Sequence, residues 1–536
     1  LNNASISNTT TAPIKVLDAK KVILTLADNT TNTITDSSRL STEEDYSAAI
    51  YSKEDLIING NGTLNVNAGY RNGIKSTDDC IIVSGTLNIT STEDGIIGKD
   101  LCGIVAGDIN INAGSDGIKS TYDTDTTKGN VIIEGGNITI KASNDGIQAE
   151  NILVINDGTI NIKTNNGAAD TTQTHTDNMY MGRGGFGFNN NKTTTTTDDT
   201  AESRKGIKAG NMLIINDGDI TIDSDDDSVH CNSVIYIYGG TINAATGDDG
   251  VHADDLLTVN GGTINITQCY EGLEADDIVI NDGDISVVSS DDGINSSDGS
   301  ITINGGNLLI NASGDGLDAN GSIIINGGYI VVLGPTSDGD TAIDYDDSCT
   351  INGGTVMAFG SSGMLEIPKG ASNGACIVTA FTSVSGGSKY TLSDSNGNEI
   401  LSYTPSKAYA AAIVYSDKIT TGNTYDITAG STTLSIEVTS DVTSNVSSGL
   451  GKAGGMNMPG NGGSGMPNNG SSDNGMNGNS NGSMPDMSGN GAPDMNGNSS
   501  GDMPSMGGNS SNNGGNMPNM NNGSSNGSAP QMNNRM

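Results

Sequence analysis

The stretch Gly261-Gly262-Thr263-Ile264-Asn265-Ile266-Thr267, followed by Glu271-Gly272-Leu273-Glu274, decides the fold of this chain. In its first part aliphatic and polar residues alternate, so the aliphatic side chains face one side of a β-strand and Thr and Asn face the other. The two glycines before the strand and the Glu-Gly pair after it are residues that tight turns favour. We therefore expect a short strand between two sharp turns.

The same unit recurs at intervals that are mostly 21 to 23 residues long. The strand has counterparts at Gly85–Ile89 and Gly158–Ile162, and the turn has counterparts from Asp94-Gly95-Ile96 to Asp315-Gly316-Leu317. Strands this short do not form a stable sheet alone, but stacked coil upon coil they bury a continuous aliphatic column. A nine-residue calcium roll has a much shorter repeat, and the Leu and Asn framework of a leucine-rich repeat is missing. The sequence therefore predicts an all-β parallel β-helix of about 12 to 13 coils.

The repeat sets the expected domain boundaries. Residues 1–48 are expected to form an N-terminal cap and residues 49–369 the β-helix. Residues 370–445 contain strand-like runs and are expected to form a small β module that caps the other end. Residues 446–536 hold 13 of the 18 methionines among Gly, Asn, Ser and Pro. That composition is too poor in apolar residues to form a core, so we expect a disordered tail, serving either as a spacer or wall-embedded segment or as a soft-metal ligand.

Two insertions interrupt the coils. Residues 122–129 add a short loop, and residues 167–204 add a long one that is rich in Thr, Asn and Gly. Long loops on a rigid scaffold often carry function. A disordered excursion is the other interpretation of the longer insertion.

The six cysteines have no zinc-type spacing. Cys80, Cys102 and Cys349 occupy the same offset from their turns, which favours inward packing as small apolar residues. Because neighbouring coils lie ~4.8 Å apart, a disulfide between Cys80 and Cys102 is the alternative.

Charge limits the partners. The formal net charge is −40, which disfavours nucleic acid and anionic membranes. No apolar stretch approaches the ~18–20 residues of a membrane span. The chain begins at Leu1, and we expect that a signal peptide was removed and that the protein is secreted or held at the cell surface, as a monomer.

Stacking places equal offsets from successive turns above one another, and three such columns are acidic. The residue before the turn glycine gives Asp227, Asp249, Glu271, Asp292 and Asp315; the residue before that gives Asp226, Asp248 and Asp291; and the second residue after the glycine gives Glu274, Asp318 and Asp344. Asp before Gly is also ordinary turn chemistry. Between Lys208 and Lys369, however, there are 27 acidic residues, two histidines and no Lys or Arg.

Uncompensated acidic columns predict a bound cation. Like charges stacked ~5 Å apart repel by about 1 kcal/mol even in water. Clusters of carboxylate oxygens favour calcium over zinc or copper. We therefore predict that the acidic columns hold Ca²⁺.

Other residues near the turns have simpler interpretations. His230 and His252 lie 22 residues apart, and they are either hydrogen-bond partners of the acidic columns or ligands of a transition metal. In earlier coils three lysines are expected to form ion pairs with three aspartates. The lysines are Lys75, Lys119 and Lys208, and the aspartates are Asp94, Asp116 and Asp145.

The repeated Asp-Gly-Ile and Asn-Gly-Gly-Thr units, with the segments Tyr270–Glu274 and Gly314–Gly321, resemble a family of secreted bacterial carbohydrate-binding β-helix proteins that bind cellulose and pectic acid. The resemblance covers roughly residues 45–440. It implies a right-handed parallel β-helix, bound calcium and a fold similar to the family 9 polysaccharide lyases. Those lyases hold calcium with Asp residues of adjacent coils and use a Lys as base.

The lyase pattern is incomplete in this sequence. The residues that suit it are Asp292, Asp315 and Asp318, or Asp249, Glu271 and Glu274, but Gly314 and Tyr270 replace one member of each set. Abstracting the α-proton of a uronate needs a base near the metal, and no Lys or Arg follows until Lys369.

We therefore expect a non-catalytic, calcium-dependent protein that binds plant or cell-wall polysaccharide, cellulose or polygalacturonate. Trp is absent, so Asn and Thr ladders would contact sugar hydroxyls while calcium bridges to uronates. Two alternatives stay open. One is a calcium-dependent pectate lyase with His252 as base, and the other is a structural or adhesive surface protein that calcium stabilises.

Overall fold

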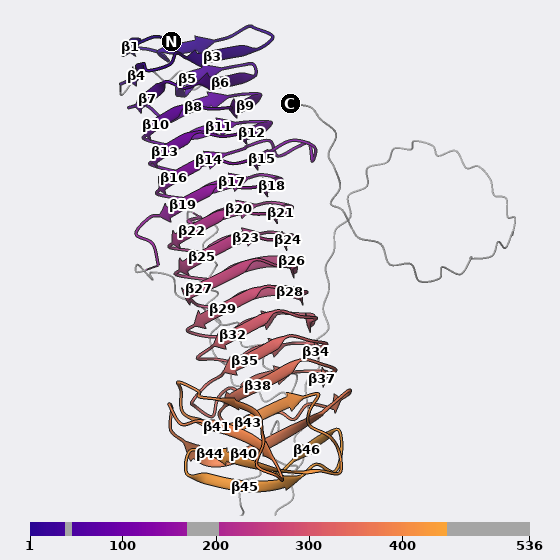
Figure 1. The fold of residues 1–536 in the computed structure, drawn as a ribbon. Coiled ribbons are helices and arrows are strands. Elements are labelled where there is room, and N and C mark those ends of the chain that lie inside the picture. Colours follow the sequence, from indigo (N-terminus) through magenta and orange to yellow (C-terminus); the bar gives the residue numbers. More distant parts are fainter. Residues whose placement is uncertain (38–45, 169–202, 447–536) are drawn as a thin grey trace, which may run out of the picture. The chain divides into compact units, whose positions relative to one another are not determined.

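The computed structural model describes residues 1–37, 46–168 and 203–446. These residues form strands and no α-helix, so none of them offers a helix that could span a membrane. The strands wind into a parallel β-solenoid of about 13 turns (Figure 1). The predicted fold class is confirmed. Most of the 167–204 insertion and the tail after residue 446 lie outside the described residues.

Two long sheets run the length of the solenoid. Sheet A contains β1 (Ser5–Asn8), β4 (Thr31–Asp36), β7 (Thr63–Ala68), β10 (Thr86–Ser91), β13 (Asp108–Ala113), β16 (Asn137–Ala142), β19 (Thr159–Thr164), β22 (Asp219–Ser224), β25 (Thr241–Thr246), β27 (Thr263–Cys269), β29 (Asp284–Ser289), β32 (Asn307–Asn311), β35 (Tyr329–Leu333), β38 (Thr355–Gly360), β40 (Ala375–Val384), β43 (Tyr409–Ser416) and β46 (Val442–Ser444).

Sheet B supplies two short strands to most coils. It contains β2 (Ile14–Val16), β3 (Val22–Leu26), β5 (Ala48–Ser52), β6 (Leu56–Gly60), β8 (Asn72–Ser76), β9 (Asp79–Ile82), β11 (Ile96–Gly98), β12 (Leu101–Ile104), β14 (Ile118–Lys119), β15 (Asn130–Ile133), β17 (Ile147–Ala149), β18 (Ile152–Ile155), β20 (Ile207–Ala209), β21 (Met212–Ile215), β23 (Val229–Cys231), β24 (Val234–Ile237), β26 (Val251–Val259), β28 (Leu273–Ile280), β30 (Ile294–Ser296), β31 (Ile301–Ile303), β33 (Leu317–Ala319), β34 (Ser322–Ile325), β36 (Ile343–Tyr345), β37 (Ser348–Ile351) and β39 (Gly370–Ala371).

Each coil repeats the same path. A strand of sheet A leads through a sharp corner into sheet B, and a second turn returns the chain to sheet A. Parallel pairing stacks identical positions, so that Ile264 lies between Ile242 and Ile285 in register. The inward aliphatic residues of sheet A are almost completely buried, and Ile264 is 0% exposed. The residues that the period-two pattern of the sequence predicts to face inward thus form the core.

The corner glycine is required by a close backbone approach. A Cβ atom on Gly250 would lie 2.5 Å from the carbonyl oxygen of Gly272, the corner glycine of the next coil. It would also lie 2.4 Å from the Cδ1 atom of Ile266. A side chain at this position would separate the stacked corners, which explains why glycine recurs there.

The last described segment forms a module of a different kind. Strands β40, β43 and β46 extend sheet A with antiparallel pairing of β43 to β38. Sheet C contains β41 (Tyr390–Asp394), β42 (Glu399–Tyr403), β44 (Thr424–Ala429) and β45 (Thr432–Glu437). Tyr390 and Tyr409 pack edge-on against Phe359 of the last solenoid coil, so the module shares a core with the outer face of sheet A.

All six cysteines are buried and free. Cys80 and Cys102 are neighbours in register on β9 and β12, with both side chains inside the core. This arrangement agrees with inward packing.

Candidate functional site

The acidic column before the corner glycine has a structural role in most coils. One oxygen of each aspartate in this column from Asp94 to Asp315 accepts the backbone N–H of the same position in the next coil. The N–H of Asp249 donates to Asp227 Oδ1 at 3.1 Å, and the N–H of Asp315 donates to Asp292 Oδ1 at 2.6 Å. The N–H of Asp116 donates to Asp94 Oδ1 at 3.1 Å in the earlier coils. The carboxylates therefore fasten coil to coil and keep one further oxygen for another partner.

That further partner comes mainly from the column two residues after the corner. Parallel register stacks this column continuously, and its later members are Lys119, Gln148, Lys208, His230, His252, Glu274, Asn295, Asp318 and Asp344. We call it the post-corner column. Its chemistry changes from lysine through histidine to acid along the solenoid.

Lysine provides the partner in the early coils. Lys119 Nζ lies 2.6 Å from Asp116 Oδ2, as the sequence predicts. Lys208 instead donates to the Ser203 hydroxyl at 3.2 Å, and Lys75 donates to the Ser47 hydroxyl at 3.3 Å. Only one of the three predicted lysine–aspartate pairs is therefore a direct contact among the described residues.

Lys205 neutralises the first group of predicted calcium ligands. It precedes the corner glycine Gly206 and thus sits in the acidic column itself. Its Nζ lies 2.6 Å from Asp227 Oδ2 and 2.8 Å from Asp226 Oδ1. Despite burial, Lys205 and the neighbouring His230 hold the pKa of the Asp227 carboxyl well below its usual range. Arg204 contacts the buried Asp225 at 2.8 Å in the same way.

In the next two coils a histidine of the post-corner column contacts the corner carboxylate. His230 Nδ1 lies 2.8 Å from Asp227 Oδ2, while His252 Nδ1 lies 3.2 Å from both Asp249 Oδ2 and Glu274 Oε2. Burial lowers the pKa of His252, but the hydrogen bond to Asp249 and the charges of Asp227 and Glu274 raise it to about 10. A protonated imidazole neither ligates a metal nor accepts a proton, so His252 acts as a charged hydrogen-bond donor in this state.

From Glu274 onward the post-corner column contains Glu274, Asn295, Asp318 and Asp344, and it supplies no cation to the acidic corners. Oxygens of Asp292, Asp315 and Asp318 lie within 4.8 Å of one another. Burial is the largest cause that raises the pKa of Asp292 and of Asp315 to about 9, and the charge of Asp318 contributes to both shifts. Asp344 stacks directly on Asp318. We call Asp292, Asp315 and Asp318 the acidic triad.

A glycine beside the triad lets the carboxylates lie close to the backbone. Gly314 has no side chain, and a Cβ there would lie 2.4 Å from Oδ1 of both Asp291 and Asp292. The charged neighbours that act on Asp292 are Asp318, Asp291 and Glu271, all of them acids. An all-oxygen set of this kind matches the donors that calcium prefers.

Glu271 and Glu274 connect the two ends of the column. Burial raises the pKa of Glu271 to about 9 and that of Glu274 to about 8, with nearby acids adding to both shifts. Burial likewise raises the pKa of Asp248 to about 8, with Asp249 next in effect. Asn295 Nδ2 donates to Glu271 Oε2 at 2.8 Å. The predicted ligands therefore share one edge, with Asp226, Asp227, Asp248 and Asp249 next to Lys205 or a histidine and the later acids next to one another.

A second acidic group was not predicted. Asp55, Asp78 and Asp79 meet at the turn between the two short strands of sheet B. Burial raises the pKa of Asp79 to about 6, and Asp55 and Asp78 add to the shift. The sequence contains a signal for this group, since Asp55 and Asp79 are one repeat apart, but the turn between the short strands has no glycine motif that marks it. Lys21 lies 4.0 Å from Asp55 at this turn.

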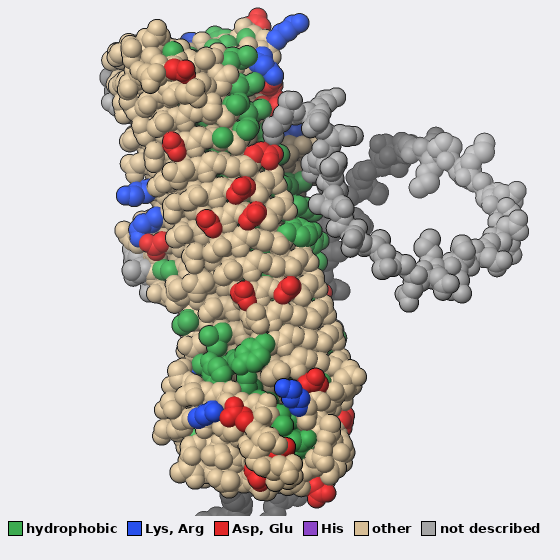
Figure 2. Space-filling model, viewed as in Figure 1, with side chains coloured by type: hydrophobic (Ala, Val, Ile, Leu, Met, Phe, Trp, Pro, Cys, Tyr) green, Lys and Arg blue, Asp and Glu red, His purple; other side chains and the backbone are tan. Residues whose placement is uncertain are grey.

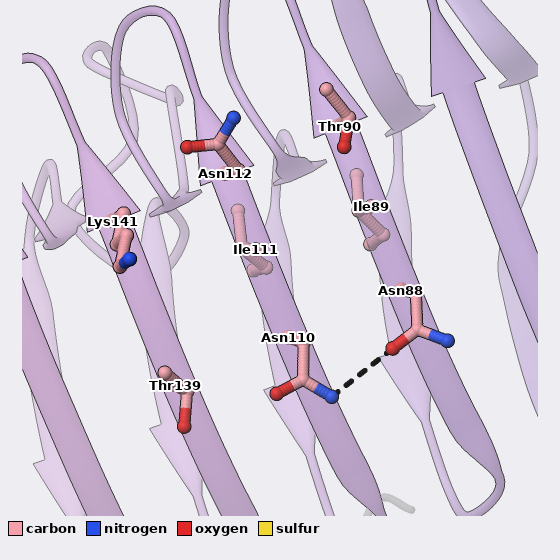
Figure 3. A pocket seen from close by; sticks show the side chains of 8 residues that line it. All are labelled: Asn88, Ile89, Thr90, Asn110, Ile111, Asn112, Thr139 and Lys141. Carbon is pink, nitrogen blue, oxygen red and sulfur yellow. Dashed lines mark hydrogen bonds between the residues drawn. The ribbon is translucent and has the colours of Figure 1, made fainter.

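The outer face of sheet A carries a shallow groove of about 240 Å³. Asn88, Asn110, Thr139 and Lys141 are among the residues that line it, on three neighbouring strands (Figure 3). Asn110 Nδ2 donates to Asn88 Oδ1 at 3.1 Å, and Asn88 Nδ2 donates to Asn65 Oδ1 at 2.9 Å. This is the amide ladder that the sequence predicts, and amides can donate to and accept from sugar hydroxyls.

A protein-family model described as "Carbohydrate-binding domain-containing protein" matches residues 1–250 and 248–388. The chain belongs to this carbohydrate-binding family. A protein of the same description from Acetivibrio thermocellus is 39% identical over 93 residues, which are 17% of this chain and 32% of the relative. The chain thus matches about a third of that relative's length.

A solved structure, titled as the polysaccharide lyase-like protein from C. thermocellum in a gadolinium derivative, is 36% identical to this chain. The match covers 31% of this chain and 68% of that one, with a TM-score of 0.30. Membership of the carbohydrate-binding family confirms the predicted resemblance.

Proposed function

We propose that this protein binds plant or cell-wall polysaccharide outside the cell without cleaving it, and that calcium held by the acidic triad takes part. The observation that carries the proposal is the change in the post-corner column. Before Glu274, Asp116 meets a lysine, and Asp227 and Asp249 each meet a histidine, whereas beyond it Asp318 and Asp344 occupy the same column and bring no cation. A cation from solution balances these later corners.

Calcium suits the place better than the other common cations. Asp292, Asp315 and Asp318 offer oxygen atoms only, and Asp291 and Asp344 lie beside them. Calcium accepts six to eight oxygen ligands in a flexible geometry, so protein carboxylates leave positions for water or for a ligand. A galacturonate carboxylate would replace water in one of those positions, which links the metal to polygalacturonate.

Binding without cleavage fits the groups around the metal site. A lyase needs a base that removes the α-proton of a uronate. Lys407, from the C-terminal module, is used elsewhere, because its ammonium donates to the carbonyl oxygens of Ala312 and Leu333. His252 is held in its charged form by Asp249 and Glu274. Neither group is placed to act as that base.

The test is retention on immobilised polygalacturonate with and without a calcium chelator. We expect chelation and the double change Asp292→Asn, Asp318→Asn each to reduce retention at least tenfold. The control is Asp116→Asn, a corner carboxylate that Lys119 already balances, and it should bind as the wild type does.

The same samples decide between the candidate functions. The ultraviolet absorbance of unsaturated uronate should stay flat in the presence of calcium. Growth of this absorbance that His252→Ala abolishes would make the protein a pectate lyase. Calcium-dependent stability without retention on polygalacturonate or cellulose would make it a structural surface protein.

A further inference from the structure

The outer face of sheet B has an unusual composition. Outward positions of sheet A carry mainly Thr and Asn, whereas outward positions of the second short strand in sheet B are mainly aliphatic from β9 to β26. Two neighbouring columns run across these strands. The first contains Leu101, Asn130, Ile152, Met212, Val234 and Leu256, and the second contains Ile81, Gly103, Ile132, Val154, Ile214 and Tyr236.

We call these two columns the apolar stripe. Its aliphatic side chains are half-buried, each shielded by the coils above and below, and their remaining surface faces outward. Seven strands at ~4.8 Å give a stripe about 30 Å long, and two outward positions give it a width of about 12 Å. Figure 2 shows green side chains along the right-hand edge of the upper coils, where Figure 1 places β9 to β24.

An aromatic pair marks one end of the stripe. Tyr236 lies in the second column, and Tyr238 follows it on the same side of the chain. Their rings are stacked at 6.4 Å between centroids, and Tyr238 is 47% exposed. Tyrosine offers a flat apolar ring with a polar tip, which suits a ligand that is itself part apolar and part hydroxylated.

The stripe is uncharged in a protein whose net charge is −40. Neither column holds an ionisable carboxylate or cation between Leu101 and Leu256, and in the first column an acid stands just beyond each end. Asp79 is the register neighbour of Leu101, and Asp277 is that of Leu256. Acidic flanks repel a polyuronate, so the complementary ligand is neutral.

A second copy of this chain is a poorer occupant. The stripe measures about 350 Å², so two copies would bury about 700 Å² in total, below the ~1,200 Å² at the lower limit of stable interfaces. A flat, narrow and uncharged strip is instead the complement of an extended glycan chain. The coil spacing of ~4.8 Å is also close to the length of one sugar residue in such a chain.

We propose that the apolar stripe binds the C–H faces of an uncharged, extended β-linked glycan that lies along the solenoid, with about one sugar ring to each coil. This rests on the proposed function, because it assigns a second surface to the same polysaccharide-binding role. It differs from the acidic triad in ligand charge and needs no calcium.

The test uses substitutions that the fold already accepts at the same register positions. Thr258 and Thr302 continue the second column beyond the stripe, and Ser300 and Ser322 continue the first. The stripe variant is therefore Ile152→Ser, Val154→Thr, Met212→Ser and Ile214→Thr in the full chain. The matched control is Ile324→Thr, in the second column but outside the stripe.

Binding to insoluble cellulose is measured by depletion of protein from solution in the presence of chelator. We expect the wild type and Ile324→Thr to bind and the stripe variant to bind at least tenfold more weakly, with an unchanged melting temperature. The proposal would be overturned if the stripe variant bound as strongly as the wild type or if the wild type did not bind. It would also be overturned if the wild type formed a dimer and the stripe variant were a monomer. Retention on polygalacturonate, measured separately with calcium, reports on the proposed function alone.

Discussion

Removing one charge from the acidic triad should have opposite effects with and without calcium. Asp315→Asn keeps Oδ1, which accepts the N–H of Thr341, and replaces Oδ2 with an amide. The bond between coils therefore survives while the charge is lost. We expect the variant to be more stable than the wild type without calcium and less stable than the wild type with it.

The magnitude follows from the spacing of the carboxylates. Oxygens of Asp315 lie within 4.8 Å of those of Asp292 and Asp318. Two unit charges at that distance repel by about 1 kcal/mol in water and by about 3 kcal/mol at an effective dielectric constant near 20. The variant should therefore gain about 1–3 kcal/mol in metal-free buffer at a pH above about 9, where Asp292 and Asp315 are charged in the wild type. The wild type should gain about 2.7 kcal/mol at a hundredfold excess of calcium over its Kd, a gain that the variant loses.

Thermal unfolding in chelator and in saturating calcium gives the four melting temperatures that are needed. The control is Asp116→Asn, which also keeps its Oδ1 bond to the next coil but loses the ion pair with Lys119. It should melt below the wild type in both buffers and respond to calcium as the wild type does. If Asp315→Asn also melts lower in both buffers, the carboxylate is a structural group and the reasoning about calcium is wrong.

Three further predictions test other parts of the structure. Without metal, the free energy of unfolding should fall as pH rises from about 4 to about 9, because the pKa of Asp292 and Asp315 is about 9 in the folded protein and about 4 in the unfolded chain. Calcium should weaken this pH dependence. Urea unfolding at a series of pH values measures it. Lys205→Met should destabilise the protein by about 3–5 kcal/mol in urea unfolding, because it removes the buried ammonium that contacts both Asp226 and Asp227. A loss below about 1 kcal/mol would contradict the pairing. Deleting residues 446–536 should leave the melting temperature and the bound calcium unchanged, and loss of folding on truncation would show that the tail packs.

The fold could be predicted because local and long-range signals agree. Alternating strands such as Thr263–Thr267 set the inward face, and the glycine that follows each strand sets the corner. The 22-residue period then aligns every coil with the next, so the inward column of Ile242, Ile264 and Ile285 needed no further information.

The compensation of the acidic column was harder to predict. Counting basic residues after Lys208 shows none before Lys369, yet Asp226 and Asp227 are balanced by Lys205, which precedes that window. Alignment of the corners contains this signal, since Lys205 takes the place of the acid in its own coil. The side chain of Lys205 pairs with residues of the neighbouring coil, which lie about one repeat away in the sequence, rather than with its neighbours in the sequence.

The apolar stripe escaped prediction for a different reason. A run such as Ile152–Ile155 is apolar at every position, and such a run is typical of a strand that is buried on both faces. In this solenoid only Leu153 and Ile155 reach the core, while Ile152 and Val154 face outward. The run alone does not distinguish a covered strand from one with an apolar outer face.

Each corner carboxylate has two oxygens, one for a structural bond and one for a variable partner. In most coils one carboxylate oxygen accepts a backbone N–H from the next coil, and this bond is the same at Asp94, Asp227 and Asp292. The partner of the second oxygen is free to vary, because the fold does not depend on it. Where that partner is Lys119 or Lys205, the corner is closed by the protein itself. Where it is Asp318, the same geometry has no cation of its own, so a structural corner becomes a place for calcium without any change in the backbone.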